Sequence, residues 1–278
     1  MPTDSPFGTL RPLTSMTVPA ATPHASQEGF VTLEVREGIA TVRFHHPKGN
    51  SLPGAVLRRL AEAVETAGRD PAARVVVLRS EGNGPFCAGA SFDELTRIDT
   101  PDTGREFFMG FARLILAMRS CPKLVIARVH GKAVGGGVGI VAAADYAAAL
   151  ETASVRLSEL AVGIGPFVVG PAIERKIGAA AFQALAIDAA GWRDARWAER
   201  HGLFASIHAT VAELDAVIDG LAKRLAASNP DATARLKQTF WEGTDHWDEL
   251  LPKRAELSGT LVLSDFTRRA IAEFAARG

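Results

Sequence analysis

Alternating apolar and polar positions near the start of the chain predict a β-hairpin. Residues 31–36 and 39–44 alternate in this way on either side of Glu37-Gly38, and a short glycine turn between two such segments is typical of a hairpin. The period then changes, because apolar residues within 53–69 recur at helical spacing and 74–79 is an apolar run typical of a buried strand. The hairpin is therefore followed by a helix and another strand.

The same order of strand and helix recurs further along. The predicted elements are an amphipathic helix over 104–119, a strand over 124–129, a helix of small residues over 135–144, and short strands over 146–151 and 154–157. From about Val168 the remainder is predicted to be mostly helical, interrupted at Gly178, Gly191, Gly202 and Asn229-Pro230. This pattern predicts an α/β fold with a helical C-terminal region.

The composition of the first 28 residues differs from the rest. Residues 1–28 are rich in Pro, Thr, Ser and Ala and offer little apolar surface, so we expect a flexible N-terminal arm. We expect the α/β core to occupy 29–200 and the helical C-terminal region to occupy 201–278.

Charge and cysteine content narrow the function classes. Thirty-one basic residues balance 31 acidic ones, so no overall field favours nucleic acid or an anionic membrane as a partner. No apolar run reaches the roughly 20 residues of a membrane span. Cys87 and Cys121 lie far apart without metal-ligand spacing, which indicates a reducing, cytoplasmic location. His45 and His46 have no carboxylate or cysteine at ligand spacing, so no metal site is expected.

Two glycine-bearing segments, 86–92 and 130–139, each follow a predicted strand and precede a predicted helix. Small residues let a backbone approach a ligand closely, and the N–H groups of a helix's first turn carry partial positive charge. Two such groups aimed at one oxygen would form an oxyanion hole. Tight packing of helix against sheet is the alternative interpretation of the glycines.

These two segments, together with 157–166, 46–52 and the final helix around 264–274, resemble the enoyl-CoA hydratase/isomerase (crotonase) family. The resemblance covers nearly everything after Phe30. It implies a crotonase-like spiral of repeated ββα units that acts on an acyl-CoA thioester. Coenzyme A would then be part of the substrate, with no permanently bound cofactor. The resemblance also implies a homo-oligomer, a trimer or a dimer of trimers, in which 201–278 serves oligomerisation and covers the active site.

The resemblance also implies roles for individual residues. Glu159 matches the position of a catalytic carboxylate, and the backbone N–H groups of Ala90 and Gly136 match the donors that bind the thioester oxygen. The implied ligand-contacting positions are Lys48, Cys87, Ala88, Gly89 and Gly135, and a largely apolar pocket is expected from Val162, Ile164, Pro166 and Phe167. For Lys48, contact with nucleotide phosphates and a solvated loop lysine remain alternatives.

One family feature is missing from the sequence. Hydratases of the family carry a second glutamate three residues after the oxyanion-hole glycine, and that position is Gly139 here. Adding water usually requires a second acid or base, whereas family isomerases work with one glutamate at the position of Glu159. We therefore expect isomerase-like proton transfer between the α- and γ-carbons of an enoyl chain.

Several alternatives remain open. Another acid could replace the missing one and restore hydratase activity, and Asp93, Glu94 and Glu174 are the candidates near the motifs. A catalytically silent acyl-CoA-binding protein, or another enolate reaction such as decarboxylation, is also compatible with the same motifs. Arg156 directly precedes the Leu-Ser-Glu motif and could pair with a carboxylate of a branched dicarboxylic acyl group.

Overall fold

The structure is a computed structural model that describes residues 28–277, with side chains described as far as Glu273. The predicted arm at 1–28 lies outside the described residues except for Glu28. Within the described part of the chain, every helix is too short or too polar to span a membrane.

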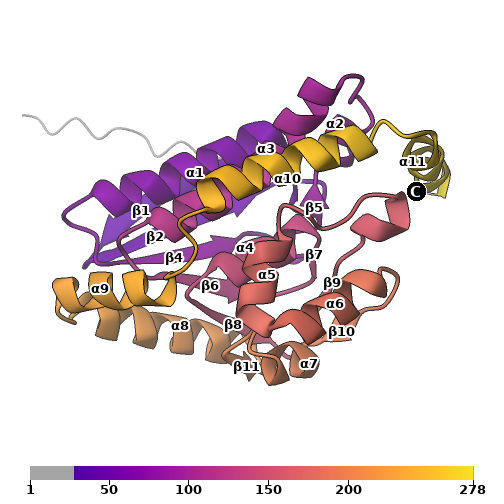
Figure 1. Cartoon of the computed structure of the whole chain (residues 1–278). Coiled ribbons are helices and arrows are strands. Elements are labelled where there is room, and N and C mark those ends of the chain that lie inside the picture. Colours follow the sequence, from indigo (N-terminus) through magenta and orange to yellow (C-terminus); the bar gives the residue numbers. More distant parts are fainter. Residues whose placement is uncertain (1–27, 278) are drawn as a thin grey trace, which may run out of the picture.

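A six-stranded sheet forms the centre of the molecule (Figure 1). In spatial order its strands are β1 (Phe30–Arg36), β2 (Ile39–His45), β4 (Val75–Ser80), β6 (Val125–Val129), β8 (Tyr146–Leu150) and β11 (Ser206–His208). β1 and β2 pair antiparallel with Arg36 opposite Ile39, and the other pairs are parallel. Glu37 and Gly38 both have positive φ, 50° and 80°, as a two-residue hairpin turn requires. The predicted hairpin is confirmed.

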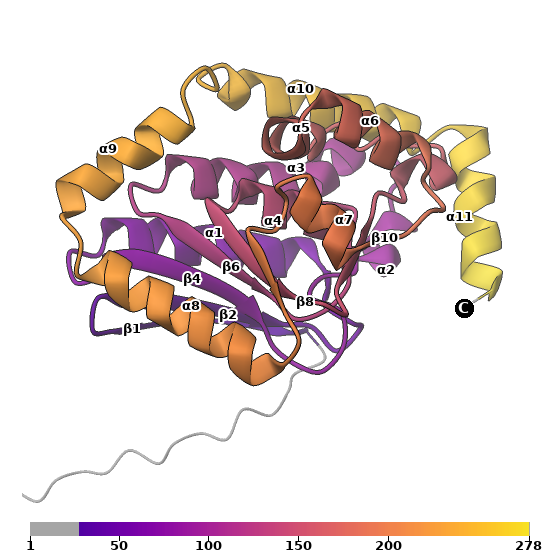
Figure 2. The same cartoon turned by 90° about the horizontal axis from the view of Figure 1, so that it is seen from below.

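Helices cover both faces of this sheet (Figures 1 and 2). In β4, Val75 and Val77 pack with Leu214 and Ile218 of α8 (Val211–Ala226) on one face. The intervening Val76 and Leu78 belong to the larger core on the other face, which includes α1 (Gly54–Arg69) and α3 (Pro101–Ser120). Because β4 is apolar on both faces, it lacks the alternation of β1 and β2.

Two small sheets connect the loops that follow the central strands. β3 (Ser51–Leu52) pairs with β5 (Gly89–Ala90), and β7 (Ala133–Val134), β9 (Ser154–Arg156) and β10 (Arg193–Asp194) form a three-stranded sheet in the order β10-β9-β7. An isolated bridge joins Cys87 to Ala133. Short helical elements follow these strands: α2 (Phe92–Leu95), α4 (Gly136–Ala143) and the 3₁₀ turn η1 (Glu159–Val162). This pairing places the two glycine-bearing segments side by side.

The C-terminal part is mostly helical, as predicted. Its helices are α5 (Gly170–Ile177), α6 (Ala179–Ile187), α7 (Ala195–Arg200), α8, α9 (Pro230–Phe240), α10 (Trp247–Leu261) and α11 (Asp265–Arg277). α10 packs along α3, and α11 packs against η1. Five short strands among the described residues were not predicted from the sequence: β3, β5, β7, β10 and β11. Each contains two or three residues, too few to show a period along the sequence.

A buried ion pair fastens α9 to the core. Lys237 is only 2% exposed, and its Nζ donates to Asp145 Oδ2 at 2.9 Å and to the Met118 carbonyl oxygen at 2.7 Å. Trp241 Nε1 donates to the second oxygen of Asp145 at 2.9 Å. These hydrogen bonds hold the C-terminal end of α9 against the core, between α8 and α10 along the chain.

Candidate active site

The two glycine-bearing segments are held together by backbone hydrogen bonds. Val134 N–H donates to the Cys87 carbonyl at 2.9 Å, and Cys87 N–H donates to the Lys132 carbonyl at 3.2 Å. Gly135 N–H donates to the Arg156 carbonyl at 2.9 Å, so β9 also joins this arrangement. As a result β5, the start of α4 and the segment leading to η1 converge at one place.

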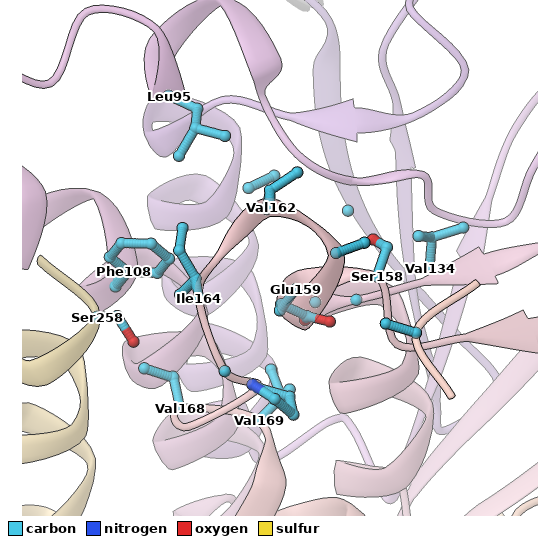
Figure 3. A pocket seen from close by; sticks show the side chains of 18 of the residues that line it. Leu95, Phe108, Val134, Ser158, Glu159, Val162, Ile164, Val168, Val169 and Ser258 are labelled. Atoms are coloured by element: carbon cyan, nitrogen blue, oxygen red, sulfur yellow. The ribbon is translucent and has the colours of Figure 1, made fainter. Parts of the chain in front are cut away.

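A cavity of about 640 Å³ lies where these elements converge. Most of the predicted site residues line it: Ala88, Gly89, Ala90, Gly135, Gly136, Glu159, Val162, Ile164, Pro166 and Phe167. Figure 3 shows Glu159 between Ser158 and Val134 on one side and Val162 and Ile164 on the other. On this second side the cavity extends to α2, α3 and α10, which contribute the apolar Leu95 and Phe108 and the polar Ser258.

Glu159 presents its carboxylate to the glycine turn. It is the first residue of η1, which ends at Gly163 in a left-handed conformation (φ 78°). Gly135 has φ +52°, and a Cβ placed there would lie 2.9 Å from Glu159 Oε1, so only glycine leaves this space for the carboxylate. The Glu159 carboxylate therefore lies against the same turn that begins α4.

The environment of Glu159 suits a base that works near neutral pH. Its Oε2 atom is buried and has no hydrogen-bond partner in the structure. Burial raises the pKa of Glu159 from 4.5 to about 7, while its own backbone N–H and the positive charge of Arg156 act in the opposite direction. A carboxyl group of this pKa exchanges its proton readily at physiological pH.

The position of the missing second acid is filled by apolar atoms. A Cβ at Gly139 would lie 2.5 Å from Val169 Cγ1 and 3.6 Å from Ile115 Cδ1. Val169 itself lines the cavity. A side chain at position 139 would thus collide with Val169 unless the loop before α5 moved.

Two predicted ligand contacts lie outside the cavity lining. Lys48 forms an exposed ion pair with Asp93. Cys87 is fully buried, and burial raises the pKa of its thiol to about 12. The Cys87 sulfur and carbonyl lie against Gly137, so this residue supports the start of α4 from behind. Roles for Lys48 and Cys87 in binding stay predictions.

The three acids suggested as replacements for Gly139 are also outside the lining. Asp93 pairs with Lys48, Glu94 Oε2 accepts a 2.8 Å hydrogen bond from Gly54 N–H at the start of α1, and Glu174 is exposed on α5. A different acid, Glu273 of α11, does line the cavity.

Other lining residues were missed by the sequence analysis. Phe107, Phe108 and Phe111 reach the cavity from α3, and Ser258 and Ala270 reach it from α10 and α11. The aromatic cluster within α3 was the available signal for the first three. In the described part of the chain, no three His, Cys, Asp or Glu side chains are grouped so as to hold a metal ion.

A family model described as enoyl-CoA hydratase/isomerase matches residues 34–268. One relative is the (7aS)-7a-methyl-1,5-dioxo-2,3,5,6,7,7a-hexahydro-1H-indene-carboxyl-CoA hydrolase of Rhodococcus jostii (strain RHA1), 37% identical over 124 residues that cover 45% of this chain and 48% of the relative. Another is a probable enoyl-CoA hydratase of Bacillus subtilis (strain 168), 30% identical over 140 residues that cover 50% and 54%. The chain thus spans about half the length of these curated relatives.

The structural likeness extends further than these alignments. A crystal structure of a putative enoyl-CoA hydratase from Mycobacterium avium paratuberculosis K-10 matches with a TM-score of 0.80 and 28% sequence identity. The match covers 89% of this chain and 97% of that chain. It confirms the crotonase-like α/β fold with a helical C-terminal region.

Proposed function

We propose a function from one premise: the chain belongs to the enoyl-CoA hydratase/isomerase family. The proposed substrate is an acyl-CoA thioester, bound in the 640 Å³ cavity with its thioester carbonyl at the turn that begins α4. The proposed reaction is proton transfer beside that carbonyl through an enolate, with Glu159 as the base.

One observation carries this proposal. A carboxylate with one buried oxygen that lacks a hydrogen-bond partner lies against the Gly135-Gly136 turn, inside a cavity large enough for an acyl group. Burying a carboxylate without a full set of hydrogen bonds lowers the stability of the fold. Groups of this kind are concentrated at functional sites. The raised pKa of Glu159, about 7, supports a role as a base that also returns the proton.

The proposed oxyanion hole consists of the Ala90 and Gly136 N–H groups. Both residues line the cavity, and they come from β5 and the first position of α4. The first N–H groups of a helix have no partner within the helix, and one such donor lowers the barrier to enolate formation by about 3–4 kcal/mol. The enolate that forms when Glu159 removes the α-proton would be held by these two donors.

The filled position at Gly139 favours isomerisation over hydration. Val169 occupies the space into which a second carboxylate would project, so a water molecule lacks a base on that side. A single acid–base group is sufficient for isomerisation, because the proton that Glu159 removes from the α-carbon of a β,γ-enoyl-CoA can be returned at the γ-carbon, which leaves the double bond between the α- and β-carbons.

Hydration is the second candidate, because Glu273 of α11 also lines the cavity. In that case Glu273 would orient the water and Glu159 would exchange the proton at the α-carbon. Replacing Glu273 with glutamine separates the two reactions. Isomerisation should be unaffected, whereas hydration of an α,β-enoyl-CoA should fall by about 10²-fold or more.

Assembly and location are part of the same proposal. Leu236, Phe240 and Leu257 are exposed on α9 and α10, which supports a homo-oligomer, a trimer or a dimer of trimers, formed through apolar contacts. Ser258 of α10 and Ala270 of α11 line the cavity, which supports the predicted role of the C-terminal region as a cover. A cytoplasmic location stays a prediction.

The experiment that tests this proposal measures isomerisation and the incorporation of deuterium into the product. The protein is mixed with a β,γ-enoyl-CoA in deuterated water, the conjugated product is followed by absorbance, and the label is located by mass spectrometry. Glu159→Gln should lower the rate by about 10²–10⁴-fold. Glu94→Gln is the matched control, because Glu94 hydrogen-bonds Gly54 N–H outside the cavity, and it should retain activity. Equal rates for the wild type and Glu159→Gln would refute the proposal.

A further inference from the structure

The cavity wall contains a cation, Arg156, that the proposed proton transfer does not use. Among the described residues, the charged ones that line the cavity are Glu159, Glu273 and Arg156. Arg156 is the last residue of β9, and its carbonyl accepts the hydrogen bond from Gly135 N–H. The backbone of Arg156 is thereby tied to the turn that begins α4, and the residue forms part of the cavity lining.

The Arg156 guanidinium lacks an ionic partner in the part of the chain that the structure describes. Its Nε is buried and makes no hydrogen bond. Neighbouring arginines differ, because Arg193 pairs with Asp188 at 2.9 Å and Arg196 pairs with Glu151 at 3.3 Å. A buried donor without an acceptor is destabilising. The guanidinium of Arg156 therefore has hydrogen-bonding capacity that the described part of the chain does not use.

Trp192 fixes the orientation of this guanidinium. The Arg156 Cζ lies 4.6 Å from the centroid of the Trp192 ring, and Lys132 Nζ lies 5.0 Å from the same centroid. An arginine stacked on an aromatic face keeps its N–H donors available in the plane of the guanidinium, where they match the two oxygens of a carboxylate. Lys132 does not line the cavity, but it adds a second positive charge on the same indole near Arg156.

An anion bound by Arg156 could belong either to the acyl group or to the phosphates of coenzyme A, and the position of Arg156 favours the acyl group. Its positive charge acts on the Glu159 carboxylate, and that carboxylate must reach the carbon beside the thioester. The phosphates of coenzyme A are separated from the thioester by the whole pantetheine arm. An anion beside both Glu159 and Arg156 therefore belongs to the acyl group.

From this juxtaposition we infer that Arg156, stacked on Trp192, binds a carboxylate carried by the acyl group. The substrate class is then the CoA monothioester of a dicarboxylic acid. The carboxylate would accept charge-assisted hydrogen bonds from the terminal nitrogens of the Arg156 guanidinium. This inference rests on the proposed function, since it places the thioester beside Glu159.

The test compares two acyl groups of nearly equal size. Glutaryl-CoA carries a terminal carboxylate, and its methyl-ketone analogue replaces the charged oxygen with a methyl group. Binding of each is measured by titration calorimetry with the wild type, Arg156→Gln and Arg156→Lys. Arg193→Gln is the matched control, because Arg193 already pairs with Asp188 and lies outside the cavity lining.

The wild type should bind glutaryl-CoA at least about tenfold more tightly than the ketone, as expected for a charge-assisted pair. Arg156→Gln should abolish this preference and leave ketone binding within about twofold, and Arg193→Gln should keep the preference. Arg156→Lys should retain only part of it, because an ammonium lacks the planar fork. Absence of the preference in the wild type, or equal weakening of both ligands by Arg156→Gln, would overturn the inference. The wild-type comparison stands even if a variant fails to fold.

Exchange of the α-protons with deuterium separates this inference from the proposed function. In one outcome, the wild type exchanges the α-protons of the ketone analogue, Glu159→Gln does not, and the wild type binds glutaryl-CoA no more tightly than the ketone. This outcome would overturn only the role of Arg156. A preference that depends on Arg156, without exchange on either ligand, would support the carboxylate site and contradict Glu159 as the base.

Discussion

Replacing Glu159 with glutamine should stabilise the folded protein, and the gain should appear only as the pH rises. Burial raises the pKa of this carboxyl to about 7 in the folded chain, against 4.5 for an ordinary glutamate. Below 4.5 the group is protonated in both the folded and the unfolded chain, so it costs nothing. Between the two values the folded chain keeps a proton that the unfolded chain has released, and stability falls as pH rises.

The gap between 4.5 and about 7 corresponds to about 3 kcal/mol of lost unfolding free energy, at about 1.4 kcal/mol per pKa unit. The full cost is present above about pH 7 and absent at low pH. Glutamine has nearly the same shape and carries no charge at any pH, so it avoids the cost. The variant should therefore exceed the wild type by about 3 kcal/mol at about pH 8.5 and by about 1 kcal/mol at about pH 5.

Urea unfolding at these two pH values, at one protein concentration, measures the difference. The concentration is fixed because assembly adds to apparent stability. Glu94→Gln is again the control, since its carboxylate accepts a hydrogen bond from Gly54 N–H outside the cavity, and it should show no gain that grows with pH. A gain of equal size at both pH values, or a less stable Glu159→Gln at high pH, would refute the reasoning.

Three further substitutions test the surroundings of the site. Gly139→Glu should lower the unfolding free energy in urea by about 1–3 kcal/mol through overpacking against Val169, and no hydration of an α,β-enoyl-CoA should appear in an absorbance assay. Gly135→Ala should reduce turnover in steady-state kinetics by about 10²-fold, because the new Cβ would lie 2.9 Å from Glu159 Oε1. Lys237→Met should cost about 3–5 kcal/mol in urea unfolding by leaving a buried carboxylate unpaired, with kcat unchanged for the protein that remains folded.

The sequence predicted those parts of the fold that depend on local periodicity. The hairpin of β1 and β2, the helix α1 and the buried strand β4 each contain enough residues for a period to be recognised. β10 and β11 are too short for a period to be recognised. They are defined by their pairing with β9 and β8. Their formation depends on tertiary contacts that no local pattern encodes.

The candidate site shows the same division. The motifs that contain Ala90, Gly136 and Glu159 could be recognised in the sequence because each motif is contiguous, and all three residues line the cavity. The lining role of Glu273 depends on α11 folding back onto η1, a contact between segments far apart in the chain. The sequence also did not indicate the direction of the Cys87 side chain, whose sulfur packs against Gly137 of α4 and not in the cavity lining.

The apolar filling beside Gly139 connects the missing acid to the chemistry of the remaining one. An acid that removes and returns one proton works best when its pKa lies near the working pH, because neither direction of transfer is then strongly uphill. A second carboxylate nearby would raise the pKa of Glu159 further by repulsion. With Val169 in that space, burial raises the pKa of Glu159 while its own backbone N–H and the charge of Arg156 lower it, which leaves the pKa at about 7. Loss of the second acid is therefore consistent with isomerase chemistry as well as with lost hydration.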